Sequence, residues 1–231
     1  VTKFTKRADW INQLPIDSEL RKSAKAWDNK LTREAIEACR KDYADNLRLL
    51  DDQLQRLIAA TNGRNDAEET AIAVTADHGE MLGDHEMLYK GTFLEGSIRV
   101  PFQYVPPSNT REEKAVVNRP IGLTDTLKTT INNLKEGGSL KTLQWHCKQQ
   151  KHVTVEFGNE LLIIKNKLKL CCNLKGEALW CINLNKDPQE KTDLLTKNLR
   201  LFDESKRWKR LLLIAKKQVR LRQKENWRWI S

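Results

Sequence analysis

The most regular pattern of apolar positions lies in the first third of the chain. Between Thr32 and Ala60, apolar side chains recur at steps of three or four residues, which is the spacing of one helix face. The positions on this face are Ile36, Cys39, Tyr43, Leu47, Leu50, Leu54 and Leu57. Thr32 is suited to cap the first turn, and Asn62-Gly63 is suited to end the helix. The sequence therefore predicts an amphipathic helix over 32–60.

Two short runs that predict strands follow this helix. Residues 70–76 read Thr-Ala-Ile-Ala-Val-Thr-Ala, an uncharged run typical of a strand covered on both faces, as in a parallel sheet. Residues 100–105 predict a second strand, which Pro106-Pro107 would close, and residues 123–134 predict a helix. This order of elements favours an α/β fold with a partial mixed or parallel sheet and flanking helices.

The pattern changes after Gly137-Gly138, where short strand-like runs replace helices. These runs are separated by Gly-Asn, Asn-Lys and Lys-Gly turn signals, and they predict a small antiparallel meander. The four runs are Val153–Phe157, Leu161–Ile164, Lys167–Leu174 and Glu177–Leu184. Residues 1–30, in contrast, are polar and irregular, with Trp10, Pro15 and Trp27 as expected packing points.

The last segment, residues 197–231, holds most of the positive charge of the chain. It contains twelve Lys or Arg and three Asp or Glu, a net charge of +9, whereas the whole chain carries +10. Apolar residues follow helical spacing there, at Trp208, Leu211, Leu212, Ala215 and Val219. We expect a basic helix that packs this apolar stripe on the small sheet. Contact of its basic face with nucleic acid or an anionic membrane surface stays open as the alternative.

Composition narrows the class of protein. The mean hydropathy is −0.65, 31% of residues are charged, and no apolar stretch approaches the roughly 20 residues of a membrane-spanning helix. The amino terminus lacks the apolar core of a signal peptide. The five cysteines show no metal-type spacing, and the adjacent Cys171 and Cys172 should point to opposite faces of a strand. Reduced, structural thiols favour a cytoplasmic setting.

The candidate chemistry lies directly after the run at 70–76. Asp77 supplies a hard oxygen ligand and His78 a neutral nitrogen ligand for a divalent cation. Ligands of α/β sheets bind at the carboxyl ends of the strands, which is where these two residues stand. Gly79 and Gly83 allow the backbone to turn tightly and approach a ligand. For the tripeptide alone, a turn that ends a strand is the favoured interpretation.

The longer string around Asp77 and His78 resembles the sulfatase family of the alkaline-phosphatase-like superfamily. That family shows Ser/Thr-x-Asp-His/Asn-Gly, then Leu-Gly-Asp/Glu-His, then Lys, then Glu-x-x-x-Arg-Val-Pro. The chain matches with residues 75–79, with Leu82-Gly83-Asp84-His85, with Lys90, and with Glu95 followed by Arg99-Val100-Pro101. Residues 183–190, which read Asn-Leu-Asn-Lys-Asp-Pro-Gln-Glu, resemble the closing Asp-Leu-x-x-Asp-Pro-x-Glu signature. The likeness covers roughly residues 30–197 and corresponds to the carboxy-terminal half of a sulfatase.

This resemblance implies roles for four residues. Asp77 and His78 would bind a divalent cation, with calcium the best candidate, and Lys90 would face the sulfate group as the catalytic cation. His85 could touch the substrate, but we expect it to order the loop after Gly83. The implied substrate is a sulfate ester of a small molecule or a glycan.

Part of the family pattern is missing from the chain. Sulfatases carry a Cys/Ser-x-Pro-x-Arg motif whose first residue becomes formylglycine, and no Cys or Ser of this chain begins such a motif. We therefore expect this chain to be a metal-binding half that is inactive alone. A partner chain would supply the missing amino-terminal half. The alternative is a sulfatase-fold remnant without catalysis that binds an anion or a partner. The expected organisation is a catalytic α/β part over 1–136, an antiparallel part over 137–196 and a basic helix over 197–231.

Overall fold

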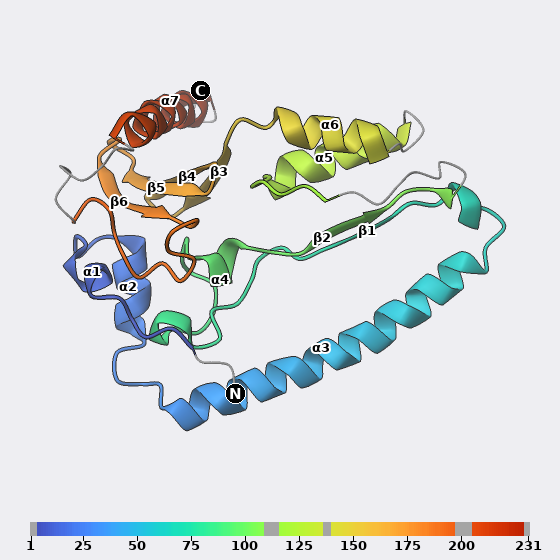
Figure 1. The fold of residues 1–231 in the computed structure, drawn as a ribbon, viewed down its shortest axis with the longest axis horizontal. Helices are drawn as coiled ribbons and strands as arrows, with labels where there is room; N and C mark the ends of the chain where they lie inside the picture. The colour runs from blue at the N-terminus through green and yellow to red at the C-terminus, as the bar shows by residue number, and fades with distance from the viewer. Residues whose placement is uncertain (1–3, 109–115, 136–139, 197–204, 229–231) are drawn as a thin grey trace.

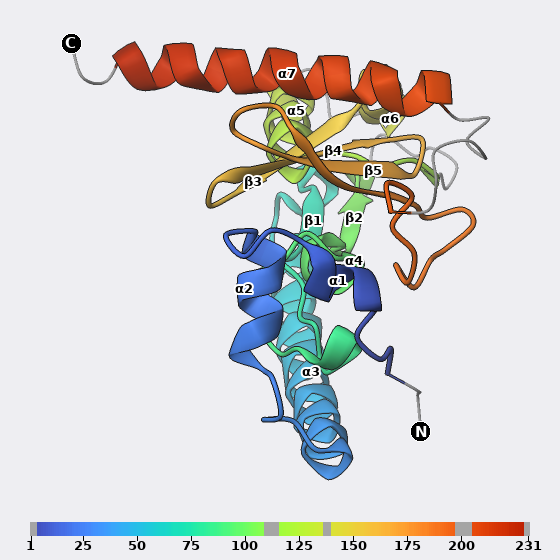
Figure 2. The same cartoon turned by 90° about the vertical axis from the view of Figure 1, so that its left-hand side faces the viewer.

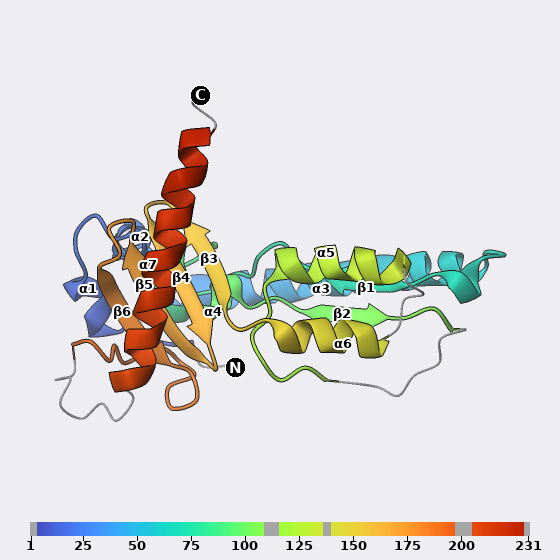
Figure 3. The same cartoon turned by 90° about the horizontal axis from the view of Figure 1, so that it is seen from above.

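The computed structural model describes residues 4–108, 116–135, 140–196 and 205–228, and the fold is taken from these residues (Figure 1). The predicted change of pattern at Gly137-Gly138 and the predicted packing of the Trp208 side chain lie outside the part of the chain that the structure describes. The described chain forms a compact body at one end and a longer arm at the other, as Figures 1 and 3 show.

The amino terminus begins with two short helices, α1 (Asp9–Gln13) and α2 (Glu19–Ala26), where the sequence predicted irregular structure. Their apolar residues are buried against the small sheet. Among them, the Trp10 ring packs at a tilt against the Trp180 ring, with ring centroids 5.7 Å apart. Short polar helices of this kind depend on tertiary packing, which local sequence periodicity does not reveal. The expectation that Trp10 and Trp27 are packing points is confirmed, whereas Pro15 is exposed and the prediction for it is wrong.

The predicted long helix is present as α3 (Arg33–Asn62). The Thr32 hydroxyl oxygen accepts a hydrogen bond from the Ala35 N–H at 3.2 Å, which confirms the predicted cap. A short turn, η1 (Ala67–Glu69), then leads into the first strand.

The two strands of the arm form a ribbon rather than part of a parallel sheet. β1 (Ile72–Thr75) pairs antiparallel with β2 (Phe102–Val105), with Ile72 opposite Val105 and Thr75 opposite Phe102. Both sheets of the described residues are antiparallel, so the expected parallel pairing is not found in this part of the chain. The strand is also only partly buried, contrary to the prediction from its uncharged composition. The described fold is nevertheless mixed α/β, with α5 (Leu123–Lys135) and α6 (Leu140–Gln149) over one side of the ribbon (Figure 1).

The predicted meander forms the centre of the body. β3 (Val153–Phe157), β4 (Glu160–Lys165), β5 (Leu168–Asn173) and β6 (Ala178–Asn183) are paired in sequence order. Side chains of one face pack on α1, α2 and the loop after β1, and side chains of the other face pack on α7 (Ser205–Arg228). Figure 2 shows α7 lying across this second face. Cys171 and Cys172 belong to opposite faces, as predicted.

The carboxy-terminal helix docks through its apolar stripe, as expected. Leu211, Ala215 and Val219 are buried against β4 and β5, while Leu213 is 68% exposed on the opposite side of the helix. In the described part of the chain, no helix is long and apolar enough to cross a membrane.

Candidate functional site

The loop between β1 and β2 carries the candidate residues and is fixed by close backbone contacts. The Gly79 N–H donates to the Ser97 carbonyl oxygen at 2.7 Å. A Cβ atom at Gly79 would lie 2.1 Å from the Gly96 carbonyl oxygen, so only glycine fits there. Gly83 has a φ of +88°, and a Cβ there would lie 2.3 Å from Ile36 Cγ2. The glycines of the motif therefore bring the loop against both α3 and α4 (Glu95–Ile98).

Asp77 and His78 lie together at the end of β1, as predicted. The Asp77 side chain is 84% exposed and the His78 side chain 37% exposed. Asp77 Oδ1 accepts the His78 backbone N–H at 2.9 Å, and Asp77 Oδ2 lies 3.4 Å from His78 Nε2. The two potential ligand atoms thus face each other at the surface of the loop.

The His78 ring is oriented by a hydrogen bond to its own backbone. Nδ1 lies 2.8 Å from the Gly79 carbonyl oxygen, which can only accept, so Nδ1 carries the proton. This leaves the lone pair of the neutral ring on Nε2. Histidine ligands of metals are commonly held by such a bond from the second ring nitrogen to a carbonyl.

Lys90 joins the same two residues. Its Nζ contacts His78 Nε2 and therefore donates to the free lone pair. The Lys90 carbonyl oxygen accepts from the Ser97 hydroxyl, which ties this residue to the same helix turn that holds Gly79. The structure thus brings together all three residues that the sequence analysis placed in the site.

His85 lies inside the loop rather than at the surface. Its backbone N–H donates to the Thr5 carbonyl oxygen at 2.6 Å, and its Nε2 lies 3.1 Å from the Gln189 carbonyl oxygen. The residue is 3% exposed, and this burial lowers the pKa of the imidazole. These contacts fit a loop-ordering role and leave the ring away from the exposed carboxylate of Asp77.

A buried charge network supports the site loop and was not recognised in the sequence. Lys169 on β5 is fully buried, and its Nζ donates to Glu190 Oε1 at 2.6 Å, to Glu95 Oε1 at 3.0 Å and to the Phe93 carbonyl oxygen at 2.6 Å. Glu190 Oε2 accepts the Glu95 backbone N–H at 2.8 Å. Glu95 therefore pairs with Lys169 on β5. Glu95 and Glu190 each belong to a sulfatase-like motif identified in the sequence. Their presence in these motifs was the sequence signal that could have indicated the network.

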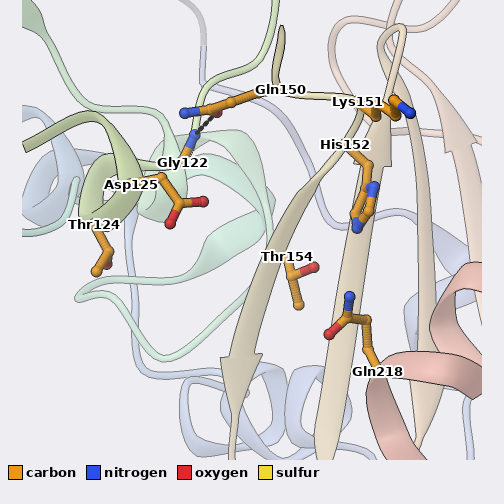
Figure 4. A pocket seen from close by; sticks show the side chains of 8 residues that line it. All are labelled: Gly122, Thr124, Asp125, Gln150, Lys151, His152, Thr154 and Gln218. Atoms are coloured by element: carbon orange, nitrogen blue, oxygen red, sulfur yellow. Dashed lines mark hydrogen bonds between the residues drawn. The ribbon is translucent and has the colours of Figure 1, made fainter. Parts of the chain in front are cut away.

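Two observations limit what the described residues provide. They contain no group of three or more His, Cys, Asp or Glu side chains that could hold a metal ion. A cavity of about 420 Å³ lies between the start of α5, β3 and α7 (Figure 4). Asp125, His152 and Gln218 help to line it, whereas Asp77, His78 and Lys90 do not. The candidate site is thus an exposed pair of donors with a neighbouring ammonium group, and its residues do not line that cavity.

Comparison with known proteins decides the family. The sulfatase family model matches residues 10–133, more than half of the chain. The chain belongs to the sulfatase family. It is 29% identical over 204 residues to an arylsulfatase of Clostridium perfringens, covering 81% of this chain and 42% of that protein. A choline-sulfatase of Rhizobium meliloti is 27% identical over 178 residues, covering 71% of this chain and 34% of the relative.

Solved structures of this sulfatase chain's relatives share its fold. A phosphonate monoester hydrolase of Silicibacter pomeroyi superposes with a TM-score of 0.71 at 17% identity, covering 94% of this chain and 50% of the other. A 2-O GAG sulfatase superposes with a TM-score of 0.65 at 16% identity, covering 95% and 53%. The chain thus spans about half the length of these structures and less than half of the curated relatives.

Proposed function

We propose that this chain is the metal-binding, carboxy-terminal half of a sulfatase-type hydrolase. Asp77 and His78 bind the divalent cation, and Lys90 binds the anionic oxygens of a sulfate ester. The observation that carries this proposal is the geometry at His78. Its Nδ1–H is committed to the Gly79 carbonyl, and its Nε2 lone pair is turned toward Asp77 Oδ2 at 3.4 Å. A carboxylate oxygen and an imidazole nitrogen at this separation suit neighbouring positions around one cation.

The donor set favours calcium and predicts weak binding. Calcium takes about six to eight oxygen ligands, so two side chains plus water leave most of the shell to solvent or to another polypeptide. The cation would supply a Lewis acid that polarises an oxygen of the ester group. The residues of this chain would orient the cation and place one fixed positive charge beside the anion.

Lys90 links the two parts of the site. Its ammonium group now occupies the His78 Nε2 lone pair, so the cation and Lys90 compete for that nitrogen. If His78 Nε2 held a cation, the Lys90 ammonium group would be free to donate to a sulfate oxygen. The proposed substrates are therefore sulfate esters of small alcohols or glycans, and phosphonate or phosphate esters share the same charge and oxygen donors.

Catalysis requires more than these residues. No Cys or Ser of the chain begins a Cys/Ser-x-Pro-x-Arg motif, so the chain has no residue suited to become formylglycine in that context. We propose that the isolated chain does not turn over sulfate esters and that another polypeptide segment completes the site. The free cysteines, four of them buried, suit a reducing compartment, which supports the cytoplasmic setting expected from the sequence.

Cation binding by the purified chain tests the proposal. Titration with calcium chloride, followed by calorimetry or by backbone NMR shifts of residues 76–91, should show a dissociation constant of about 1 mM or weaker. Asp77→Ala and His78→Ala should each abolish the response. Asp45→Ala, which removes a carboxylate paired with Arg48 on the surface of α3, should leave it unchanged. Binding that survives both site substitutions would refute the proposal, and so would arylsulfate hydrolysis by the chain alone.

A further inference from the structure

Helix α7 has a second face, opposite the stripe that packs on the small sheet. The helix turns by about 100° per residue, so the side chains opposite the buried stripe can be read from their positions. Figure 3 looks onto this side of the helix, and no described element lies over it there. Five side chains fall within about 100° of arc on this side and are here called the outer face of α7: Arg210, Leu213, Lys217, Arg220 and Leu221.

The outer face combines positive charge with apolar side chains in contact with solvent. All five residues are exposed, and the three basic ones surround the two leucines. Leu213 is 68% exposed and Leu221 is 43% exposed, about two helical turns farther along. The helix thus keeps apolar side chains in water although its buried stripe already supplies the contact with the sheet.

No acidic side chain offsets this charge along most of the helix. Residues 205–224 contain nine Lys or Arg and neither Asp nor Glu. The positive potential of the outer face therefore attracts a polyanion. A second copy of the chain would bring an equally positive face, so self-association through this surface is disfavoured.

We infer that the outer face of α7 binds an anionic lipid surface, with the helix axis parallel to the membrane plane. The basic side chains contact the anionic headgroups, and Leu213 and Leu221 enter the boundary between headgroups and acyl chains. The long Lys and Arg side chains can reach the headgroups while the shorter leucines lie deeper.

The two leucines favour lipid over nucleic acid as the occupant. Phosphate groups of a duplex would match the basic residues equally well, because these contacts carry no further chemical requirement. Leu213 and Leu221 would then lie against a charged sugar–phosphate backbone and gain nothing from it. A lipid surface uses both kinds of side chain on the outer face.

The inference goes beyond the proposed function and does not depend on it. The site loop and α7 pack on opposite faces of the small sheet. Docking of α7 on that sheet and binding of lipid also use opposite faces of the helix, so both interpretations of the basic segment hold together. Because the helix is already folded and docked, lipid binding does not have to compensate for the cost of helix formation.

Co-sedimentation with vesicles tests the inference on the full chain. The probe is a vesicle of phosphatidylcholine with roughly 30% phosphatidylserine. EDTA is present, so that calcium cannot bridge protein and lipid. We expect binding that is at least tenfold stronger than to vesicles of phosphatidylcholine alone and that weakens as sodium chloride screens the exposed charges. Absence of binding, or equal binding to the two kinds of vesicle, would overturn the inference.

Substitutions on the outer face locate the contact. Lys217→Gln and Arg220→Gln should each weaken binding about fivefold, as expected for loss of one charge near an anionic surface. Leu213→Ala should also weaken it about fivefold, because apolar area that enters the lipid is lost. The matched controls lie on α3, where Lys41 is exposed and Leu57 is 64% exposed. Lys41→Gln and Leu57→Ala should bind as the parent chain does, and effects equal to those on the outer face would contradict the inference.

Three further measurements complete the test. Thermal unfolding of each variant should match that of the parent, because the replaced side chains are exposed. Binding to generic duplex DNA without preference for anionic vesicles would assign the outer face to nucleic acid and overturn the inference. Asp77→Ala should bind vesicles as the parent does. A failed calcium titration would therefore refute only the proposed function, and failed vesicle binding would refute only the lipid contact.

Discussion

At the scale of single residues, the Lys90 ammonium group and the proposed cation compete for the lone pair of His78 Nε2. His78 Nδ1 donates to the Gly79 carbonyl oxygen, and His78 Nε2 accepts from the Lys90 ammonium group while it lies 3.4 Å from Asp77 Oδ2. The positive charge of Lys90 beside His78 should weaken the binding of a cation and strengthen the binding of an anion. The same lysine therefore has opposite effects on the two ligands that the proposal requires.

Replacement of Lys90 should separate these effects. Lys90→Met removes both the competing donor and the like charge, and we expect calcium affinity to rise roughly thirtyfold, because a unit charge and a doubly charged ion about 4 Å apart in water repel by about 2 kcal/mol. Sulfate affinity should fall by a similar factor. Calorimetric titrations with calcium chloride and with sodium sulfate at fixed ionic strength measure both. Lys41→Met on exposed α3 is the control, and unchanged affinities for both ions in Lys90→Met would contradict this account.

The pH dependence of stability should report His85. Burial lowers the pKa of this imidazole in the folded chain relative to about 6.5 in the unfolded chain. The unfolded state then binds more protons, so the stabilising effect is complete above pH 6.5 and is lost as the pH falls through the folded value. Burial raises the pKa of Glu160, Glu190 and Asp193, which contributes the opposite slope at acidic pH.

A difference measurement isolates the histidine. Urea unfolding at pH 7.5 and pH 5.5 should show that the parent chain loses more stability on acidification than His85→Gln. The free energy of unfolding of His85→Gln at pH 7.5 should also be lower, because the contact with Gln189 is altered. Equal pH slopes in the two proteins would show that His85 does not titrate between these pH values.

At the scale of elements, Lys169 connects the meander to the site loop. β5 carries this lysine into the core face, where Glu95 at the start of α4 and Glu190 in the closing segment receive its ammonium group. The network therefore fixes α4, and α4 fixes Gly79 and Lys90 through Ser97. Burial raises the pKa of Glu190, and the charge of Lys169 acts against that shift.

Breaking this network should cost stability. Lys169→Met leaves the buried Glu190 carboxylate without its cation, and we expect a loss of about 3–5 kcal/mol in the free energy of unfolding. The double substitution Lys169→Met with Glu190→Gln should recover part of that loss, because no unpaired charge remains there. Lys167→Met, at an exposed position of the adjacent turn, is the control for urea unfolding. A loss below about 0.5 kcal/mol for Lys169→Met would refute the role of the network.

The elements also show what local patterns can and cannot predict. Helix α3 and the α7 stripe follow from periodicity, because one apolar face suffices to define each of them. The four meander strands follow from short runs separated by turn signals. Lys169 was missed because a lysine within a strand-like run gives no sign of its distant partners Glu95 and Glu190, and because both faces of this strand are covered. The parallel strand was wrongly predicted because an uncharged run does not specify its partner. The candidate site residues could be identified from a sequence motif. The contacts among Gly79, Ser97 and Lys90 could not be predicted from the sequence, because they depend on how the loop packs against α4.

At the scale of the whole molecule, the body and the arm differ in how well they are covered. The meander is packed on both faces, and α7 forms one of its two covers. The arm exposes an apolar helix face and two strand edges. Most of the net positive charge belongs to the segment that contains α7, so the helix that completes the core also carries the basic surface of the chain.

This arrangement makes the docking of α7 a structural requirement, and one pair of substitutions tests it. Ala215 is fully buried against the sheet, so Ala215→Asp places a charge without a partner in that interface and should cost at least about 3 kcal/mol. Leu213→Asp makes the same charge change on the exposed side of α7 and should change stability by less than about 0.5 kcal/mol. Urea unfolding measures both. If the helix served instead as a separate nucleic-acid-binding element, the two variants would be equally stable. Binding of the parent chain to generic duplex DNA would then weaken steeply with salt, because phosphate contacts release counterions.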